Sequence, residues 1–214
     1  MMKSVSESKP TRLIVGISGA SGVIYGIRLL QALQPLPVES HLVVSRSAEL
    51  TLAYESDLSL RDLQSLADVV HGRDDMGAAV SSGSFRTLGM VVAPCSVRSM
   101  AEIASGVTTS LLTRAADVVL KERRRLVLMV RETPLHAGHL RNLLSLAEMG
   151  AVIAPPVPAF YTNPTSLEQV VDQSVGRVLD LFDLESTAVQ RWGETGEEGA
   201  RRRRGRLEKK GAKD

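Results

Sequence analysis

Short apolar runs alternate with longer amphipathic segments along most of the chain. The runs are rich in valine, isoleucine and leucine, and most are continuous rather than interrupted by polar residues. A continuous apolar run is typical of a strand in a parallel sheet that is covered on both faces. The predicted strands are Leu13–Ile17, His41–Val44, Met90–Ala93, Leu126–Val130 and Ala151–Ala154.

Between these runs, apolar residues recur every three or four positions, which indicates helices. The turn at 163–165 precedes the last of them. The section 68–87 is the least regular and is assigned no element. The alternation predicts one α/β domain with a doubly wound, mainly parallel, Rossmann-like sheet. The predicted helices are Gly22–Leu33, Ser47–Glu55, Ser99–Ser105, Ser110–Glu122, Ala137–Met149 and Ser166–Leu184.

Polar residues follow each predicted strand. In a parallel sheet the carboxyl ends of the strands share one edge, and ligands bind there. Small hydroxyls, arginines, a carboxylate and an aromatic pair converge on this edge, which predicts a polar pocket with phosphate-binding chemistry. The segments that follow the strands are Ser18–Gly22, Ser45–Ser47, Pro94–Ser99, Arg131–Pro134 and Pro155–Tyr161.

The first of these segments lies in the stretch VGISGASGVIYGIRLL, from Val15 to Leu30. A strand, a glycine turn and a helix start in succession can bind an anion, because backbone N–H groups and the helix dipole face the ligand. The pattern matches neither GxxxxGK[ST] nor GxGxxG. A turn that only packs a helix against a strand would have the same sequence, so the turn alone leaves both interpretations open.

Three further features each have a functional and a structural interpretation. Arg131-Glu132 is either a surface ion pair or a carboxylate placed for proton transfer. Phe160-Tyr161 is either core packing or a wall for a planar ring or an allyl group. Cys95 is interpreted as a small buried side chain rather than a nucleophile.

No metal site is predicted. His136 and His139 are three residues apart but have no third ligand at the expected spacing. The pair at 74–75 lacks the further acidic residue of a DDxxD motif, so these groups are interpreted as solvated. Arg114 and Lys121 are seven residues apart, on one face of a helix, and could reach a phosphate together.

Composition narrows the class of protein. With 214 residues and 43% hydrophobic content, the chain can form one domain with a full core. A single cysteine excludes an intramolecular disulfide and favours a reducing compartment, which we interpret as the cytoplasm. The first nine residues are polar rather than a signal peptide, and no apolar run has the length of a membrane span.

The net charge of +2 hides an uneven distribution. Residues 200–214 contain eight basic and two acidic residues, so the preceding 199 residues carry 18 basic and 22 acidic groups. The basic tail could contact nucleic acid or an acidic surface, but the simpler interpretation is a disordered terminus. The body lacks a basic stripe interleaved with aromatic residues, so nucleic-acid binding is not expected as the main function.

Eight stretches occur in a fixed order along the chain: GISGASGVIYGIRLL, VVSRSAELTLAYESD, SSGSFRTLGM, APCSVRS, TRAADVVLKERR, VLMVRETPLHAGHL, GAVIAPPVPAFYTNP and a closing RW. In this order they resemble the UbiX-type flavin prenyltransferases, from about Arg12 to Trp192. The resemblance implies a flavoprotein domain at 12–192, flanked by a flexible N-terminus at 1–11 and a basic, disordered tail at 193–214.

The resemblance also implies an activity and partners. Members of this family have a Rossmann-like flavoprotein fold and assemble as homododecamers. They join a dimethylallyl group from dimethylallyl phosphate to N5 and C6 of reduced FMN. The product, prenylated FMN, is the cofactor of UbiD-type decarboxylases, for example in ubiquinone biosynthesis.

The resemblance assigns roles to individual residues. It implies that FMN is bound by Gly19, Ala20, Ser21, Ser45, Ser96, Val97, Arg98, Ser99 and Arg131. It implies that dimethylallyl phosphate is bound by Arg114, Lys121, Tyr161 and Arg177, with Trp192 nearby. The residues implicated in the chemistry are Ser21, Glu55 and Glu132.

These roles agree with the chemistry of allyl transfer. Arginine and lysine can stabilise a phosphate leaving group without a metal. Glu132 is a suitable base for the C6 proton of the flavin, with Ser21 as a relay, and Arg131 beside it should favour the ionised carboxylate. The nucleophile is N5 of the flavin, so no cysteine or histidine nucleophile is required.

Two other functions remain open at this point. One is an FMN-dependent decarboxylase related to the cysteine decarboxylases, which share the fold but have PASANT where this chain has PCSVRS. Those enzymes also need an active-site histidine and a substrate-clamp motif, which we do not find. The other is a flavin carrier without chemistry, which would leave Glu132 and Arg177 unexplained.

Overall fold

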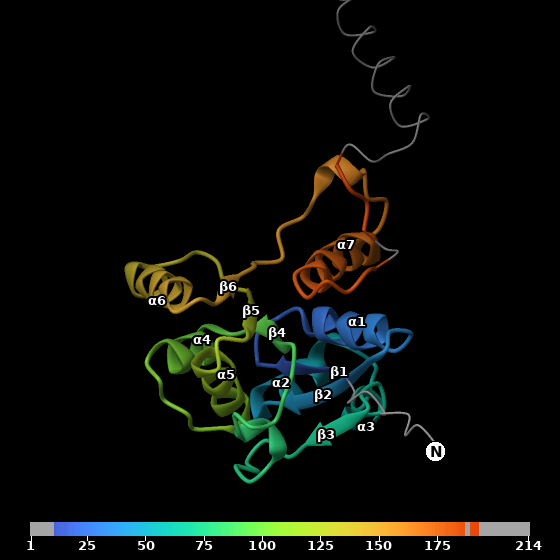
Figure 1. Cartoon of the computed structure of the whole chain (residues 1–214). Helices are drawn as coiled ribbons and strands as arrows, with labels where there is room; N and C mark the ends of the chain where they lie inside the picture. The colour runs from blue at the N-terminus through green and yellow to red at the C-terminus, as the bar shows by residue number, and fades with distance from the viewer. Residues whose placement is uncertain (1–10, 187–188, 193–214) are drawn as a thin grey trace, which may run out of the picture.

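The described part of the chain contains one six-stranded parallel sheet, with strand order β3-β2-β1-β4-β5-β6 (Figure 1). The computed structural model describes residues 11–186 and 189–192. The strands are β1 (Thr11–Ile17), β2 (Val38–Val44), β3 (Val69–His71), β4 (Gly89–Cys95), β5 (Arg125–Val130) and β6 (Val152–Ile153). Every neighbouring pair is parallel, which confirms the doubly wound α/β prediction.

Helices cover both faces of the sheet. They are α1 (Val23–Leu33), α2 (Arg46–Glu55), α3 (Leu60–Gln64), α4 (Val97–Ala104), α5 (Leu111–Lys121), α6 (Ala137–Glu148) and α7 (Leu167–Asp180). Two short 3₁₀ helices are η1 (Ala79–Ser81) and η2 (Phe160–Thr162). No helix in the described part of the chain is long and apolar enough to cross a membrane.

The sheet separates two apolar layers. On one face α1 and α7 pack against each other and the strands, through residues such as Leu30 and Leu179. On the other face α4, α5 and α6 cover the strands, through residues such as Leu112 and Leu146. Burying one such leucine stabilises the fold by about 1.5–3 kcal/mol, so the continuous apolar strands are explained by burial on both faces.

Three elements differ from the sequence-based expectation. The irregular section 68–87 contains the edge strand β3, which has only three residues and pairs with β2 alone. The last predicted strand shortens to the two residues of β6. The helix α3 has five residues and is stabilised by a capping box between Ser59 and Asp62. Elements this short do not produce a readable hydrophobic period.

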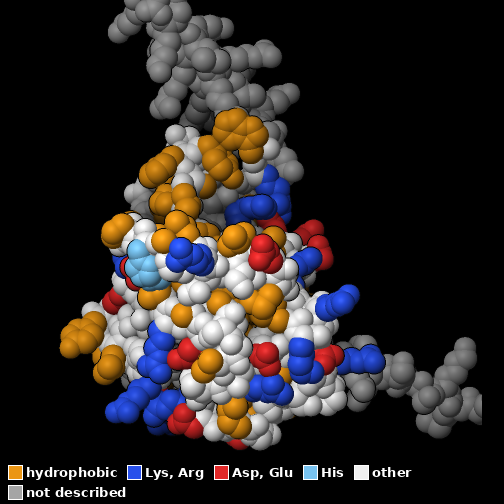
Figure 2. Space-filling view, turned by 90° about the vertical axis from the view of Figure 1, so that its left-hand side faces the viewer, with side chains coloured by type: hydrophobic (Ala, Val, Ile, Leu, Met, Phe, Trp, Pro, Cys, Tyr) orange, Lys and Arg blue, Asp and Glu red, His pale blue; other side chains and the backbone are white. Residues whose placement is uncertain are grey.

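The segment 154–166 leaves the sheet after β6, reaches η2 and returns to α7 (Figure 1). We call it the projecting segment. Val157 and Phe160 on it are 72% and 76% exposed. Figure 2 shows hydrophobic side chains gathered on this part of the molecule. An exposed cluster of large apolar side chains is typical of a surface that meets another protein.

The predicted terminal segments are described only in part. The strand β1 begins at Thr11, the last residue of the predicted N-terminal segment. Residues 1–10 and the basic tail at 193–214 lie outside the described residues. The proposed disorder of both ends therefore stays a prediction.

Candidate active site

The turns after β1, β2 and β4 are fastened to one another at the carboxyl edge of the sheet. The buried Ser18 hydroxyl donates to the Pro94 carbonyl at 2.9 Å and accepts from the Ser96 N–H at 2.7 Å. The Ser45 N–H donates to the Ile17 carbonyl at 2.9 Å. These bonds hold three of the five predicted ligand-binding segments in one place, as the parallel topology predicts.

Two of the predicted FMN-binding hydroxyls are also helix caps. The Ser45 side chain accepts from the Ala48 N–H at the start of α2, at 3.2 Å. The Ser96 side chain accepts from the Ser99 N–H at the start of α4, also at 3.2 Å. Both helices therefore direct their positive ends toward this edge, where an anion would be stabilised.

A polar cleft of about 320 Å³ lies at this edge of the sheet. Five of the predicted FMN-binding residues line it: Gly19, Ser45, Ser96, Arg98 and Ser99. A Cβ atom on Gly19 would lie 2.2 Å from the Ser47 Cβ, so only glycine allows the two turns to approach this closely. The cleft therefore combines hydroxyls, helix starts and a close backbone approach, which suits a phosphate.

Arg46 and Ser47, from the predicted segment Ser45–Ser47, also line the cleft. The cleft contains further residues that the sequence did not indicate: Arg73, Thr109 and Ser110, together with two acidic residues. Arg73 forms ion pairs with Glu49 and, at 3.5 Å, with Asp74. Its backbone carbonyl accepts from the N–H at the start of α5, at 2.9 Å. Arg73 comes from the irregular section before η1, where no local pattern points to a ligand.

Glu55 joins the end of α2 to the start of α1. Its Oε2 accepts from the N–H groups of Gly22 and Val23, at 2.7 Å and 3.0 Å. Gly22 has a φ of 99°, in the left-handed region, and no side chain of its own to cap α1. Glu55 therefore supplies the missing cap from another helix.

The pKa of Glu55 lies below its ordinary value. Loss of water around the carboxyl works to raise the pKa, but hydrogen bonds from Ser21, Gly22 and Val23, together with the charge of Arg131, outweigh it. The structure thus brings together three predicted site residues, Ser21, Glu55 and Arg131. An ionised Glu55 acts as a fixed anion that accepts hydrogen bonds, rather than as a proton donor.

Arg131 and Glu132 follow β5 at the same edge. The Arg131 N–H donates to the Cys95 carbonyl at 3.1 Å, which extends the pairing of β4 with β5. The half-buried Glu132 accepts from the Thr133 N–H at 3.0 Å through one carboxylate oxygen. Its position leaves a carboxylate available at the ligand-binding edge.

Tyr161, Arg177 and Trp192 form a second group, on the projecting segment, on α7 and on the chain after α7. The rings of Tyr161 and Trp192 meet edge to face, with centroids 5.3 Å apart. Arg177 forms an ion pair with Asp180, which also holds Arg191. Hydrogen bonds from Arg191, together with the nearby arginine charges, keep the pKa of Asp180 below its ordinary value despite partial burial.

An apolar cavity of about 230 Å³ lies beside this group, between α7 and the start of the projecting segment. Its walls include Met129, Pro156 and Leu181, and Arg177 lines it as the charged residue. An apolar cavity with one cation on its wall suits a ligand with a short hydrocarbon and a phosphate. The large exposure of Phe160 also shows that the aromatic pair is not core packing within one chain.

Within one chain, Arg114 and Lys121 do not lie near the group of Tyr161, Arg177 and Trp192. Both lie on α5, whereas Tyr161 and Arg177 lie with α7 on the opposite face of the sheet (Figure 1). Arg114 pairs with Asp117 at 2.7 Å, and Lys121 pairs with Glu122. The predicted phosphate-binding residues are therefore divided between two distant places on the chain.

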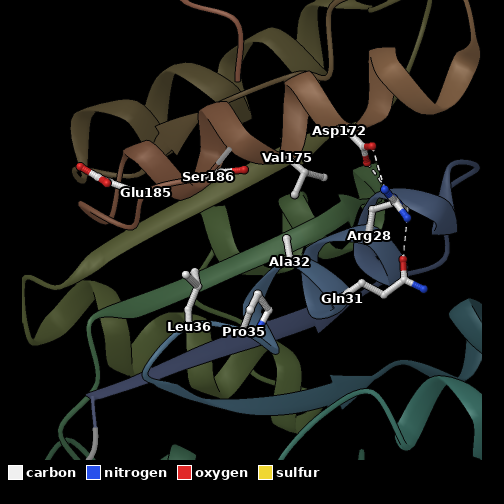
Figure 3. A pocket seen from close by; sticks show the side chains of 9 residues that line it. All are labelled: Arg28, Gln31, Ala32, Pro35, Leu36, Asp172, Val175, Glu185 and Ser186. Atoms are coloured by element: carbon white, nitrogen blue, oxygen red, sulfur yellow. Dashed lines mark hydrogen bonds and ion pairs between the residues drawn. The ribbon is translucent and has the colours of Figure 1, made fainter. Parts of the chain in front are cut away.

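A larger cavity, of about 500 Å³, lies between α1 and α7 (Figure 3). None of the predicted site residues lines it. Its most prominent charges, Arg28 and Asp172, already form two hydrogen bonds of 2.7 Å with each other. The chemistry of the walls therefore points to the smaller cavities rather than to this one.

The remaining candidates have structural roles. Burial raises the pKa of the Cys95 thiol to about 12, which supports an unreactive cysteine. His136 caps α6 by accepting from the Gly138 and His139 N–H groups. Within the described ranges, no group of three or more His, Cys, Asp or Glu side chains could hold a metal ion.

This chain is similar to known flavoproteins. The flavoprotein family model matches residues 1–192. The flavin prenyltransferase UbiX of Escherichia coli K12 is 62% identical over 174 residues, which are 81% of this chain and 92% of that protein.

Two solved structures are also similar. AnUbiX (PadA1), in complex with FMN and dimethylallyl pyrophosphate, has a TM-score of 0.85 and 54% identity, covering 86% of this chain and 98% of that one. A dodecameric FMN-dependent UbiX-like decarboxylase from Escherichia coli O157:H7 has a TM-score of 0.84 and 50% identity, covering 85% and 99%.

The fold, the polar cleft at the carboxyl edge and the similar proteins lead to one conclusion. The prenyltransferase interpretation is supported over a cysteine decarboxylase and over a carrier without chemistry. This chain belongs to the flavoprotein family and, within it, to the UbiX flavin prenyltransferases.

Proposed function

We propose that this protein transfers the dimethylallyl group of dimethylallyl phosphate to N5 and C6 of reduced FMN, and releases prenylated FMN. The observation that carries the proposal is the apolar cavity with Arg177 on its wall, separate from the polar cleft at the carboxyl edge. A carrier needs only the cleft, whereas a prenyltransferase needs a second place for the prenyl donor.

The residues of the cleft would hold FMN. We assign the phosphate to the helix starts at Ser45 and Ser96, with Gly19 allowing close approach of the backbone. Ala20, Val97, Arg98 and Ser99 belong to the same turns. Reduced FMN supplies the electron-rich N5 as nucleophile when it is bound.

The remaining residues of this edge would move protons. We propose that Glu132 takes the C6 proton, because it is the half-buried carboxylate that follows β5. Glu55 orients the Ser21 hydroxyl, which relays the proton taken by Glu132 to the leaving phosphate. Glu55 itself is not the proton donor, because its lowered pKa keeps the carboxylate ionised.

Tyr161 and Arg177 would bind the phosphate of the donor, with Trp192 against the tyrosine ring. Arginine stabilises the charge of the departing phosphate without a metal ion. We propose that Arg114 and Lys121 complete this phosphate site from a neighbouring copy. Support comes from their position across the sheet from α7 and from the exposed apolar projecting segment.

We infer a homododecamer, because a relative with 50% identity is described as dodecameric. The exposed projecting segment supports association between copies. We further infer that a UbiD-type decarboxylase receives the product, in a pathway such as ubiquinone biosynthesis, and that the protein works in the cytoplasm. The last inference rests on its single, buried cysteine.

The test is to incubate the protein with reduced FMN and dimethylallyl monophosphate, and then to weigh the extracted flavin. We expect a mass increase of one dimethylallyl group and the absorption of a cyclised product. A flavin of unchanged mass would support the carrier. Release of carbon dioxide from a peptide with a C-terminal cysteine would support the decarboxylase.

A further inference from the structure

Gln173 is a buried polar residue on α7 that no role in the reaction accounts for. It is 4% exposed, although α7 offers solvent-facing positions for a glutamine. A buried amide is retained only when its donors and acceptor are paired. The partners of Gln173 therefore indicate what it does.

All of the partners belong to the donor site or to the segment that ends in Trp192. The Gln173 Nε2 donates to the Tyr161 hydroxyl at 3.4 Å and to the Gln190 carbonyl at 3.1 Å. The Gln190 N–H donates to the Gln173 Oε1 at 2.8 Å. Gln173 also lines the apolar cavity, together with Arg177. One side chain thus connects the tyrosine, the cavity and the chain near residue 190.

The hydrogen bonds fix the direction of the Tyr161 hydroxyl. Its oxygen accepts from Gln173, so its own proton must be donated elsewhere, and it is donated to the Gln190 carbonyl at 3.3 Å. The same carbonyl also accepts from Gln173. If the phenol turned its proton toward a phosphate, the Gln190 carbonyl would keep a donor, so the change would leave no buried acceptor unpaired.

The segment 189–192 is fastened to α7 at two further points. A Cβ atom on Gly176 would lie 2.2 Å from a Val189 methyl group, so the glycine leaves the space that Val189 fills. Arg191 forms two hydrogen bonds with Asp180, at 2.9 Å and 2.8 Å. Gln173 is the fastening point that also contacts Tyr161, against whose ring Trp192 packs.

We propose that Gln173 is a positioning residue for the prenyl donor. It keeps the Tyr161 hydroxyl directed as a hydrogen-bond donor, and it holds the segment 189–192 so that Trp192 packs against the tyrosine ring. The inference rests on the proposed function, in which Tyr161 binds the donor phosphate.

The first test uses Trp192, the one tryptophan of the chain, as a spectroscopic probe in the full-length protein. Gln173→Met removes the amide and keeps a side chain of similar length. We expect the emission of Trp192 to shift and its quenching by acrylamide to increase, because the segment 189–192 loses one of its three attachments to α7, the one next to Tyr161. Gln31→Met on α1 is the matched control, since Gln31 pairs with Arg28 away from the site. Emission unchanged in Gln173→Met would overturn the proposal.

The second test measures kinetics with dimethylallyl monophosphate. We expect Gln173→Met to raise KM about tenfold, the effect of roughly one lost hydrogen bond, with a smaller change in kcat. In a Tyr161→Phe background the same substitution should change KM less than about twofold, because its effect passes through the hydroxyl. If the two substitutions raise KM by independent factors that multiply in the double variant, the proposal is overturned. If Tyr161→Phe alone leaves KM unchanged, the proposed role of Tyr161 fails, while the emission of Trp192 still reports on Gln173.

The variant Gln173→Glu separates the two roles and guards against a folding defect in Gln173→Met. A carboxylate still accepts from the Gln190 N–H but cannot donate to Tyr161 or to the Gln190 carbonyl, and it draws the phenol proton away from the phosphate. We expect a smaller shift of the Trp192 emission than in Gln173→Met, and a KM that rises further with pH as the carboxyl loses its proton. A KM that stays at the wild-type value across this pH range would overturn the proposal.

Discussion

The carboxyl edge of the sheet and the projecting segment with α7 carry the two halves of the proposed site, and they are built differently. At the carboxyl edge, Ser18, Ser45 and Ser96 tie three turns together through hydrogen bonds between buried or half-buried groups. Phe160 on the projecting segment is 76% exposed, and Trp192, after α7, is 69% exposed. The hydrogen bonds that build the first region lie within one chain, whereas the second region leaves apolar surface uncovered.

The difference between the two regions predicts where a second copy of the chain contributes to the site. The proposed flavin phosphate site is made of helix starts and turns of one chain. The proposed donor site has Tyr161 and Arg177 on one face of the sheet and Arg114 and Lys121 on the other, so as proposed it draws on two chains. The two regions should therefore respond differently to substitution.

The largest effect is expected at the carboxyl edge, from Glu132→Gln. This change keeps the size and hydrogen bonding of the side chain but removes its charge and basicity. We expect FMN and dimethylallyl phosphate to bind normally, while the cyclised product forms roughly a hundredfold more slowly or worse, as for lost general-base catalysis. Quenched reactions analysed by mass and absorption would measure it. Cyclisation at the wild-type rate would rule out Glu132 as the base and leave Glu55 as the next candidate.

The next effect tests whether the donor site is shared between copies. Arg177→Leu and Arg114→Leu should each raise KM for the donor about thirtyfold, as expected for a lost hydrogen bond to a charged group, without changing FMN affinity. When the two variants are mixed and reassembled, roughly a quarter of the sites should receive both arginines and recover activity. The measurement is steady-state turnover of the mixture. Activity no higher than that of the separate variants would place all the donor contacts within one chain.

A smaller effect concerns Glu55 and pH. Because its folded-state pKa is lowered, its stabilising contribution is complete above the unfolded-state pKa and is lost as the pH falls through the folded-state pKa. We expect Glu55→Gln to lower Tm at neutral pH, and the difference from wild type to shrink as the pH falls below the ordinary range of glutamate. Thermal melts of both proteins across acidic pH would measure it. A difference independent of pH would mean that the charge of Glu55 does not stabilise the start of α1.

The smallest effect is expected from the C-terminus. Deleting residues 200–214 should leave FMN affinity and turnover unchanged, because every predicted site residue lies at or before Trp192. Flavin titration and the mass-based assay would measure both. Loss of activity, or a change in oligomeric mass by analytical ultracentrifugation, would show that the basic tail belongs to the site or to the assembly.

The sequence by itself determined the class of fold and the carboxyl edge of the site. Continuous apolar strands such as Leu126–Val130 can be buried only between two layers of helices, so the parallel sheet follows from the pattern. Because parallel strands end at one edge, the residues after β1, β2, β4 and β5 had to meet there. The position of these residues in the sequence was sufficient to predict their place, because the strand just before each of them ends at this edge.

Only the tertiary structure decided what depends on contacts between distant elements. Arg73 reaches the cleft from an irregular section that has no hydrophobic period. Glu55 caps α1 from the end of α2. Gln173 forms hydrogen bonds with Tyr161 and Gln190, which lie on irregular segments whose path the sequence pattern does not predict. The separation of Arg114 from Arg177 depends on which face of the sheet each helix covers. A periodic apolar pattern predicts that one face of a helix is buried. The path of the chain between elements decides which other element covers that face.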